Sequence, residues 1–288
     1  MAVDLVPLLG PAQADDRTAI GARAAVDTWI EVPAHAVLRV DRVARLETHG
    51  NLVFLAGADA WKIKRAVRFS YMDFSTLEKR RTACEREMEV NHRLAPQIYL
   101  GCVPITRSAD GKLGFGGSGE AVEWAVHMRR FDQAALLSSI AAAGGIAGGL
   151  ARAVADAVFD SHAGADRVAA ASAGAQIADL ASSIGEAIGR SGTFDVEDAR
   201  RFAREVQDHA RQVGPLLETR ARQGCVRRCH GDLHLGNIVV WQDQPTLFDA
   251  IEFDEKLATV DTLYDLAFLL MDLDSHGQRQ AANIVLNR

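Results

Sequence analysis

With 288 residues, of which 48% are hydrophobic and 24% charged, the chain has a globular composition and enough material for one large domain or two modest lobes. Its formal net charge of −6 argues against a nucleic-acid-binding surface and is compatible with cationic substrates. No stretch approaches the roughly 20 unbroken apolar residues of a membrane span, and the N-terminus lacks the basic start and long apolar run of a secretion signal. We therefore expect a soluble, cytoplasmic protein with neither a membrane nor a nucleic acid as partner.

The N-terminal third begins with an extension and continues into strands. Residues 1–39 are rich in Ala and Asp and punctuated by Pro, which predicts an extension with one short helix. Residues 52–56 are typical of a strand, 57–59 of a turn and 61–64 of the return strand of a hairpin.

A long helix and two further strands follow this hairpin. Ser75 and Glu78 form a capping-box pattern, which predicts the start of a charged amphipathic helix that ends near Ala95. Strands are expected at about 100–106 and 121–128, joined by a Gly-rich loop.

The C-terminal half is mainly helical. Residues 132–190 are Ala-rich and predict helix interrupted by two glycine pairs, at 144–145 and 148–149. Residues 195–222 predict another helix. Strand–loop–strand material returns at 226–253, before a last helix that begins near Thr259. This order predicts an α+β fold of two lobes, with a small β-rich N-lobe over 40–130 that carries one long helix and a mainly helical C-lobe over 131–288.

The segment from Cys229 to Asn237 carries the strongest chemical signal. It contains His-x-Asp, with Asn237 five residues after Asp232, and a second carboxylate, Asp249, arrives in the next strand-like stretch. Phosphoryl transfer in the kinase fold needs an Asp that accepts the acceptor's proton, an Asn oxygen for Mg²⁺, and an Asp that bridges the metal to the phosphates of ATP. We therefore assign Asp232 as the catalytic base and Asn237 and Asp249 as Mg²⁺ ligands.

The same segment carries a family resemblance. A protein kinase would usually have Arg before the catalytic-loop Asp, where this chain has Gly231. The His230-Gly231-Asp232 version resembles the aminoglycoside phosphotransferase-like family, whose members phosphorylate small molecules. The resemblance implies a two-lobed protein-kinase-like fold and an ATP- and Mg²⁺-dependent small-molecule kinase, which transfers the γ-phosphoryl group to a hydroxyl of its acceptor.

A bacterial subgroup of that family shares more of the pattern. The shared segments resemble Glu47-Thr48-His49, Phe74-Ser75-Thr76-Leu77-Glu78 and Met128-Arg129-Arg130-Phe131. Members of the subgroup generally carry a second, P-loop ATP-binding domain downstream. This sequence has no G-x-x-x-x-G-K-[ST] motif, which implies either a fragment or a member that lost that half.

A kinase-type site also needs a strand lysine for the α/β-phosphates of ATP. Lys62 and Lys64 are two apart in a strand, so both point to one face and geometry alone cannot choose between them. We prefer Lys64, because Ile63-Lys64 followed by Arg65 resembles the family's ending of this strand.

The following helix offers four candidate partners for that lysine: Glu78, Glu85, Glu87 and Glu89. At 100° per residue, Glu87 lies about 60° from Cys84, at the edge of the apolar sector that should face the strands, whereas the other three lie on the exposed side. Glu87 is therefore the expected partner of Lys64.

Three further segments bear on nucleotide binding. Gly114–Gly119 matches G-x-G-x-x-G, but a strand rather than a helix follows it, so we interpret it as a hairpin turn. The turn Thr48–Asn51 is the candidate phosphate loop. Met128 lies where the lobes should join, and its backbone is the candidate adenine contact.

The remaining polar residues near the motif have structural or open roles. We expect His230 to brace the catalytic loop by hydrogen bonding, and His234 to lie on its surface, with or without contact to substrate. Tyr264-Asp265-Leu266-Ala267 resembles the family's Asp-Leu-Ala segment, which implies that Asp265 supports the loop from the following helix. Eight acidic residues between Asp249 and Asp274 could attract a polycationic acceptor, or could be helix-terminal and solvated charges.

Two alternatives remain open. Cys225, Cys229, His230 and His234 form a C-x₃-C-H-x₃-H cluster that can be read as a zinc site, although free thiols in a reducing compartment are favoured. The chain could also be a nucleotide-binding regulatory module with little or no catalysis. Neither the acceptor nor the oligomeric state can be read from the residues.

Overall fold

The computed structural model describes most of the chain. The described residues are 43–69, 71–168, 173–191 and 195–288. The extension expected over residues 1–39 lies outside them. No helix in this described part is long and apolar enough to cross a membrane.

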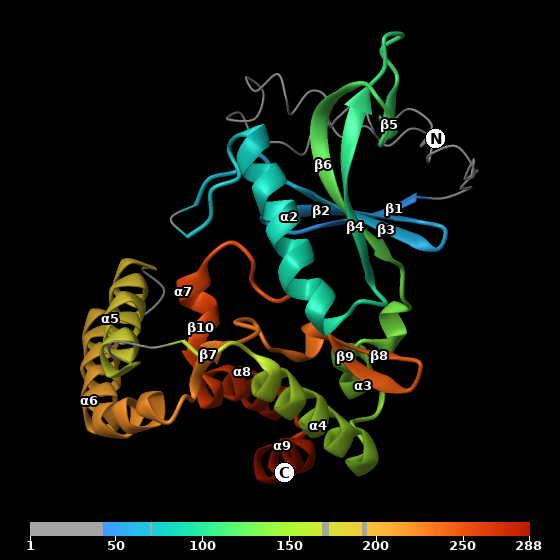
Figure 1. Cartoon of the computed structure of the whole chain (residues 1–288). Coiled ribbons are helices and arrows are strands. Elements are labelled where there is room, and N and C mark those ends of the chain that lie inside the picture. Colours follow the sequence, from blue (N-terminus) through green and yellow to red (C-terminus); the bar gives the residue numbers. More distant parts are fainter. Residues whose placement is uncertain (1–42, 70, 169–172, 192–194) are drawn as a thin grey trace. The chain divides into compact units, whose positions relative to one another are not determined.

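The chain divides into two compact units, one β-rich with a long helix and the other mainly helical (Figure 1). The first unit comprises the residues up to Gly144 together with 236–254, and the second comprises 145–235 together with 255–288. The predicted α+β fold class is confirmed. Residues 131–144 and 236–254, which the sequence places in the predicted C-lobe, belong to the β-rich unit.

The first unit is built on a six-stranded antiparallel sheet of order β1-β2-β3-β6-β4-β5. The strands are β1 (Val43–Glu47), β2 (Asn51–Ala56), β3 (Asp59–Lys64), β4 (Tyr99–Arg107), β5 (Leu113–Phe115) and β6 (Glu120–Arg129). The predicted hairpin is confirmed as β2–β3, and Gly57 makes its turn with φ 61°, a conformation that favours glycine. The Gly-rich loop contains the short strand β5, which the sequence did not predict.

Alternation along the strands gives the sheet two different faces. Trp61 and Ile63 lie in an apolar cluster on one face, whereas Lys62 and Lys64 point to the other. That second face, with Ala60 and Val126, packs against helix α2 (Leu77–Leu94), which lies along the sheet in Figure 1.

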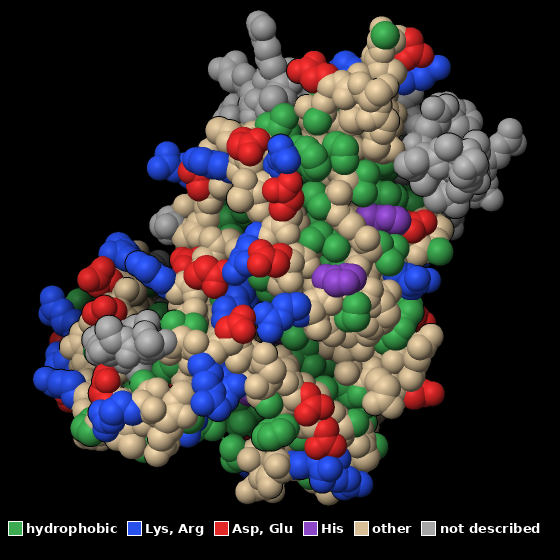
Figure 2. Space-filling view, in the orientation of Figure 1, with side chains coloured by type: hydrophobic (Ala, Val, Ile, Leu, Met, Phe, Trp, Pro, Cys, Tyr) green, Lys and Arg blue, Asp and Glu red, His purple; other side chains and the backbone are tan. Residues whose placement is uncertain are grey.

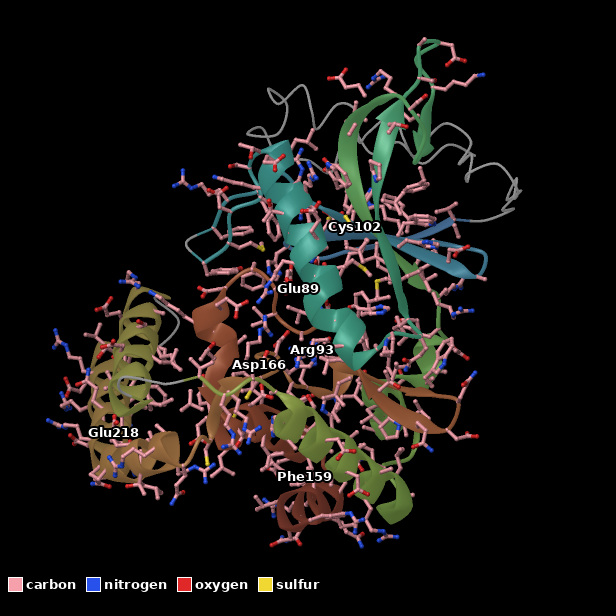
Figure 3. All side chains as sticks on the ribbon, in the orientation of Figure 1. Glu89, Arg93, Cys102, Phe159, Asp166 and Glu218 are labelled. Atoms are coloured by element: carbon pink, nitrogen blue, oxygen red, sulfur yellow. The ribbon has the colours of Figure 1, made fainter. Side chains whose placement is uncertain are left out.

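Helix α2 ends where predicted but is capped one residue later than expected. The N-cap is Thr76, whose hydroxyl accepts from the Lys79 N–H, because the Ser75 hydroxyl donates to Asp73 instead. Its burial pattern matches the predicted sector: Cys84, Glu87 and Asn91 are buried, and Glu89 lies on the exposed side of the helix (Figure 3).

The first unit is completed by α3 (Leu137–Ala143) and the hairpin of β8 (Ile238–Trp241) and β9 (Gln244–Leu247). Val239 and Phe248 belong to the same apolar cluster as Cys84 and Tyr99. The hairpin is therefore anchored in the core between α2 and the sheet, although more than a hundred residues separate it from them in sequence.

The second unit contains the remaining helices and a two-stranded sheet. These elements are α4 (Gly148–Gly164), α5 (Ala173–Ser191), α6 (Val196–Arg222), β7 (Val226–Arg228), α7 (Glu255–Ala258), β10 (Thr259–Asp261), α8 (Thr262–Ser275) and α9 (Arg279–Asn287). Gly148-Gly149 begins α4 rather than interrupting a helix, and the last predicted helix begins at Thr262, capped by Asp261. The α5–α6 hairpin carries interspersed positive and negative side chains (Figure 2).

Candidate active site

Two lysines and one glutamate form the centre of the polar cluster in the first unit. Lys62 Nζ lies 2.9 Å from Glu87 Oε1, and Lys64 Nζ lies 2.5 Å from Glu87 Oε2. All three side chains are almost fully buried. The predicted Lys64–Glu87 pair is present, and Glu87 serves both lysines.

Each lysine has a second carboxylate partner, and these partners differ. Lys62 Nζ lies 2.5 Å from Asp249 Oδ1, whereas Lys64 Nζ forms an ion pair with Glu252. The Asp249 side chain is 39% exposed and that of Glu252 only 6%, so Lys62 borders an accessible carboxylate and Lys64 is enclosed between two buried ones. The sequence could not separate the two lysines; their partners do.

These ion pairs keep both lysines charged. Burial alone lowers the pKa of Lys62, but the charges of Asp249 and Glu87 outweigh it and raise this pKa well above the ordinary value. For Lys64, burial is likewise outweighed by Glu252 and Glu87, and its pKa is raised. Both lysine side chains are therefore positively charged at neutral pH.

The segment that carries Asp249 has an unusual backbone and several anchors. Asp249 has φ 61°, a left-handed conformation that costs a non-glycine residue on the order of 1–3 kcal/mol. The Asp249 N–H donates to the Tyr99 hydroxyl at 3.1 Å. Burial, with Asp249 and Glu87 nearby, raises the pKa of Tyr99, so this hydroxyl stays protonated.

Asn237 and Asp249 lie at the same end of the β8–β9 hairpin. The Phe248 N–H donates to the Asn237 carbonyl at 3.0 Å, which extends the pairing one step beyond the ladder that joins Ile238 to Leu247. Asp249 is the next residue. The hairpin therefore brings together the backbones of Asn237 and Asp249, which are twelve residues apart in sequence.

Residues 229–235, which carry most of the predicted catalytic loop, belong to the second unit and are held by α8. The Gly231 N–H donates to Asp265 Oδ1 at 2.8 Å, and the His230 N–H to Asp265 Oδ2 at 3.3 Å. The Leu235 N–H donates to Asp272 Oδ2 at 2.8 Å. Asp265 and Asp272 are seven residues apart and so lie on one face of the helix, and together they fix both ends of the loop.

Within the loop, Asp232 is accessible and His230 is not. Gly231 has φ 84°, which allows the sharp turn, and the Asp232 N–H donates to His230 Nδ1 at 3.3 Å. The Asp232 side chain is 48% exposed, with His234 Nε2 at 3.5 Å from its Oδ2. His230 thus braces the loop, as expected, and His234 lies beside the proposed base.

Asp265 is ionised at neutral pH despite its burial. Burial raises the pKa of this carboxyl, but the hydrogen bond from His162 Nε2 at 2.8 Å, the nearby His230 and the loop N–H groups bring it below the ordinary value. A charged acceptor makes stronger hydrogen bonds to the loop than a neutral one. The structural role expected for Asp265 is confirmed.

The other predicted nucleotide contacts have local roles in the described residues. Met128 is buried in β6 and paired in register with Ala60 and Tyr99. The turn at Thr48 is closed internally, since the Asn51 N–H donates to the Thr48 hydroxyl at 3.0 Å. In the Gly-rich segment, Gly119 has a structural reason: a Cβ there would lie 2.2 Å from the Arg107 carbonyl oxygen.

The zinc reading receives little support. In the part of the chain that the structure describes, the one group able to gather on an ion is His162, Cys229 and Asp265, which leaves out the other members of the sequence cluster. Burial and the nearby Asp265 and Asp261 raise the pKa of Cys229, which disfavours the thiolate that binds metal. The Asp265 carboxylate moreover already accepts hydrogen bonds from the His230 and Gly231 N–H groups.

Several residues of these networks were not predicted from the sequence, among them Glu252, Asn91 and Asp272. Glu252 pairs with Lys64 across 188 positions, the Asn91 side chain binds the backbone of Ala250, and Asp272 holds the catalytic loop. Asn91 lies seven residues after Cys84 and so shares the helix face that should meet the strands; a polar residue in this apolar sector is the available signal. Glu252 and Asp272 belong to the eight acidic residues between Asp249 and Asp274, and the sequence indicates no contact for either of them.

The chain was compared by sequence with family models and with curated proteins. No family model matches it. Uncharacterized proteins of Mycobacterium bovis and Mycobacterium tuberculosis are 31% identical over 258 residues, covering 88% of this chain and 50% of each relative. The chain therefore spans about half the length of the curated relatives it matches.

Two solved structures with low sequence identity align with most of this chain. A choline/ethanolamine kinase family protein from Mesorhizobium loti has a TM-score of 0.49 and 15% identity, covering 93% of this chain and 73% of that one. The streptomycin–ATP–APH(2")-IIa ternary complex has a TM-score of 0.41 and 13% identity, covering 88% and 86%. These similarities assign no substrate to this chain.

Proposed function

We propose that the chain is an ATP- and Mg²⁺-dependent phosphotransferase that moves the γ-phosphoryl group of ATP to a hydroxyl of a small molecule. The observation that carries the proposal is the Glu87–Lys62–Asp249 chain of ion pairs, in which a buried lysine joins a helix glutamate to an accessible carboxylate. This is the residue set that kinase-type phosphate binding requires.

In this proposal Lys62 contacts the α/β-phosphates, which revises the preference for Lys64 drawn from the sequence. Lys62 borders the accessible Asp249, whereas Lys64 is enclosed by Glu87 and Glu252. Glu87 orients Lys62, and the adenine contact of the Met128 backbone stays a prediction.

The oxygens of Asn237 and Asp249 suit Mg²⁺, which prefers carboxylate and amide oxygen ligands. The accessibility of Asp249 and its place beside Asn237 at the end of the hairpin support this fit. When bound, the ion would neutralise charge on the phosphates. The residues of this chain supply position and orientation, which provide most of the rate in phosphoryl transfer.

Asp232 is the proposed base. The acceptor oxygen forms a bond to the γ-phosphorus, the bond from that phosphorus to the β–γ bridging oxygen breaks, and ADP leaves with the electron pair. The acceptor's hydroxyl proton passes to a carboxylate oxygen of Asp232, which is accessible and held by its own N–H to His230. His234 beside it is a candidate substrate contact.

Two single substitutions test the proposal. Asp232→Ala removes the base, so turnover should be lost while Mg²⁺-dependent ATP binding, followed by calorimetry, persists. Asp249→Ala removes the metal ligand, so Mg²⁺-dependent ATP binding itself should be lost. Unchanged ATP consumption in both variants would contradict the assignment. ATP binding by the wild-type chain without phosphate release or transfer would favour the regulatory-module alternative.

A further inference from the structure

The residue after Asp249 is gripped by an asparagine of α2. Asn91 Nδ2 donates to the Ala250 carbonyl at 3.1 Å, and the Ala250 N–H donates to Asn91 Oδ1 at 2.7 Å. Both residues are fully buried. One side-chain amide thus satisfies both backbone groups of Ala250, as a neighbouring strand would.

Asn91 also lies one helical turn from Glu87, so the two project from the same face of α2. Through Glu87 the helix reaches Lys62, which contacts the Asp249 carboxylate, and through Asn91 it reaches the backbone beside it. The helix therefore holds the metal-ligand segment at the side chain and at the main chain.

Two further contacts surround the same short segment. The Tyr99 hydroxyl, fully buried, accepts from the Asp249 N–H, and the Lys64 ammonium pairs with Glu252. Three of the four residues 249–252, namely Asp249, Ala250 and Glu252, are in this way tied to β3, α2 and β4. This density of anchors coincides with the left-handed backbone of Asp249, a conformation that persists when its surroundings over-determine it.

We propose that Asn91 is a positioning residue, which together with the Tyr99 hydroxyl sets the orientation of Asp249 as a Mg²⁺ ligand. The inference rests on the proposed function, since it assumes that Asp249 binds the ion that accompanies ATP. Neither residue contacts the ion; both act through the backbone on which Asp249 is carried.

The test compares three variants of the full 288-residue chain. Asn91→Leu keeps side-chain size and removes both hydrogen bonds to Ala250. Tyr99→Phe keeps the ring and removes the acceptor for the Asp249 N–H. Gln97→Leu is the matched control, because Gln97 Nε2 donates to Thr246 Oγ1 at 3.1 Å and so joins the same parts of the fold away from residues 249–252.

Two readouts are independent of turnover. The half-saturating Mg²⁺ concentration for ATP binding should rise roughly tenfold or more in Asn91→Leu, since residues that orient a metal ligand typically carry this much. It should rise less in Tyr99→Phe and stay unchanged in Gln97→Leu. Amide hydrogen exchange should accelerate over 249–252 in Asn91→Leu, with the rest of the chain protected as in the wild type.

A folded Asn91→Leu chain with wild-type Mg²⁺ dependence and wild-type exchange over 249–252 would overturn the inference and leave the proposed function standing. If Asn91→Leu does not fold, Tyr99→Phe decides, and an unchanged Mg²⁺ dependence there overturns it equally. A wild-type chain that binds no ATP at any Mg²⁺ concentration would overturn both the proposed function and this inference.

Discussion

At the scale of single residues, Lys62 and Lys64 differ in the carboxylate that each contacts besides Glu87, and this difference supports different roles for them. Lys64 is buried and paired with two buried carboxylates, Glu87 and Glu252. Lys62 connects Glu87 to Asp249, whose side chain is accessible. One lysine is thus suited to meet a nucleotide and the other to hold the site together.

The corresponding prediction separates binding from stability. Lys64→Met leaves Glu252 buried without its partner, and breaking a buried ion pair in this way costs roughly 3–5 kcal/mol. The free energy of unfolding, from urea denaturation, should fall by about that amount. Lys62→Met should instead abolish Mg²⁺-dependent ATP binding, because the phosphates lose their cation.

Lys62→Met retains the Lys64–Glu87 pair and is expected to lose less stability than Lys64→Met. The assignment would be reversed if Lys62→Met bound ATP as the wild type does while Lys64→Met stayed stable and did not bind ATP. This result would restore the preference for Lys64 drawn from the sequence.

Part of this site could be predicted from the sequence, because some of its interactions depend on side-chain periodicity and others only on the backbone. Glu87 was identified because helical periodicity separates inward from outward glutamates. The lysines could not be separated because strand periodicity puts both on one face. Asn91 binds a backbone, and any residue at position 250 presents the same N–H and carbonyl, so the sequence holds no matching partner to find.

At the scale of elements, α2 and α8 each carry two polar residues at helical spacing that grip a functional segment. Glu87 and Asn91 of α2 act on the Asp249 segment, and Asp265 and Asp272 of α8 act on the catalytic loop. The elements themselves were largely predictable from hydrophobic periodicity. The exact first residues of the helices were not predictable. Thr76 rather than Ser75 caps α2, because the Ser75 hydroxyl donates to the neighbouring Asp73.

The grip of α8 can be tested with a matched pair. Asp272→Ala removes the acceptor for the Leu235 N–H, so the catalytic loop loses its second anchor. Turnover should fall roughly tenfold to a hundredfold, the scale of misplacing a catalytic group by about an ångström. ATP binding should be unchanged, because the groups proposed to bind it belong to the first unit.

Asp274→Ala is the control, since Asp274 lies on the same helix two residues after Asp272, is exposed, and pairs with Arg279 rather than with the loop. Equal turnover in the two variants would show that Asp272 has no part in holding the loop. Steady-state kinetics under saturating ATP make the comparison.

At the scale of the whole molecule, the acidic run from Asp249 to Asp274 is mostly neutralised. Asp249 and Glu252 pair with the two lysines, Asp261 pairs with Arg220, and Asp265 accepts from His162 and the loop. The interpretation of these residues as an attractive surface for a polycation is therefore not favoured. The acceptor has to be found by experiment.

The most direct measurement is transfer of label from γ-labelled ATP to a panel of amino sugars, amino alcohols and nucleosides, with the wild-type chain and Asp232→Asn side by side. We expect the wild type to place the label in a phosphomonoester of at least one acceptor, and Asp232→Asn to lose this transfer by roughly a hundredfold or more, the usual contribution of a general base. Equal transfer by both chains, or label that never leaves ATP while the wild type binds it with Mg²⁺, would contradict the account.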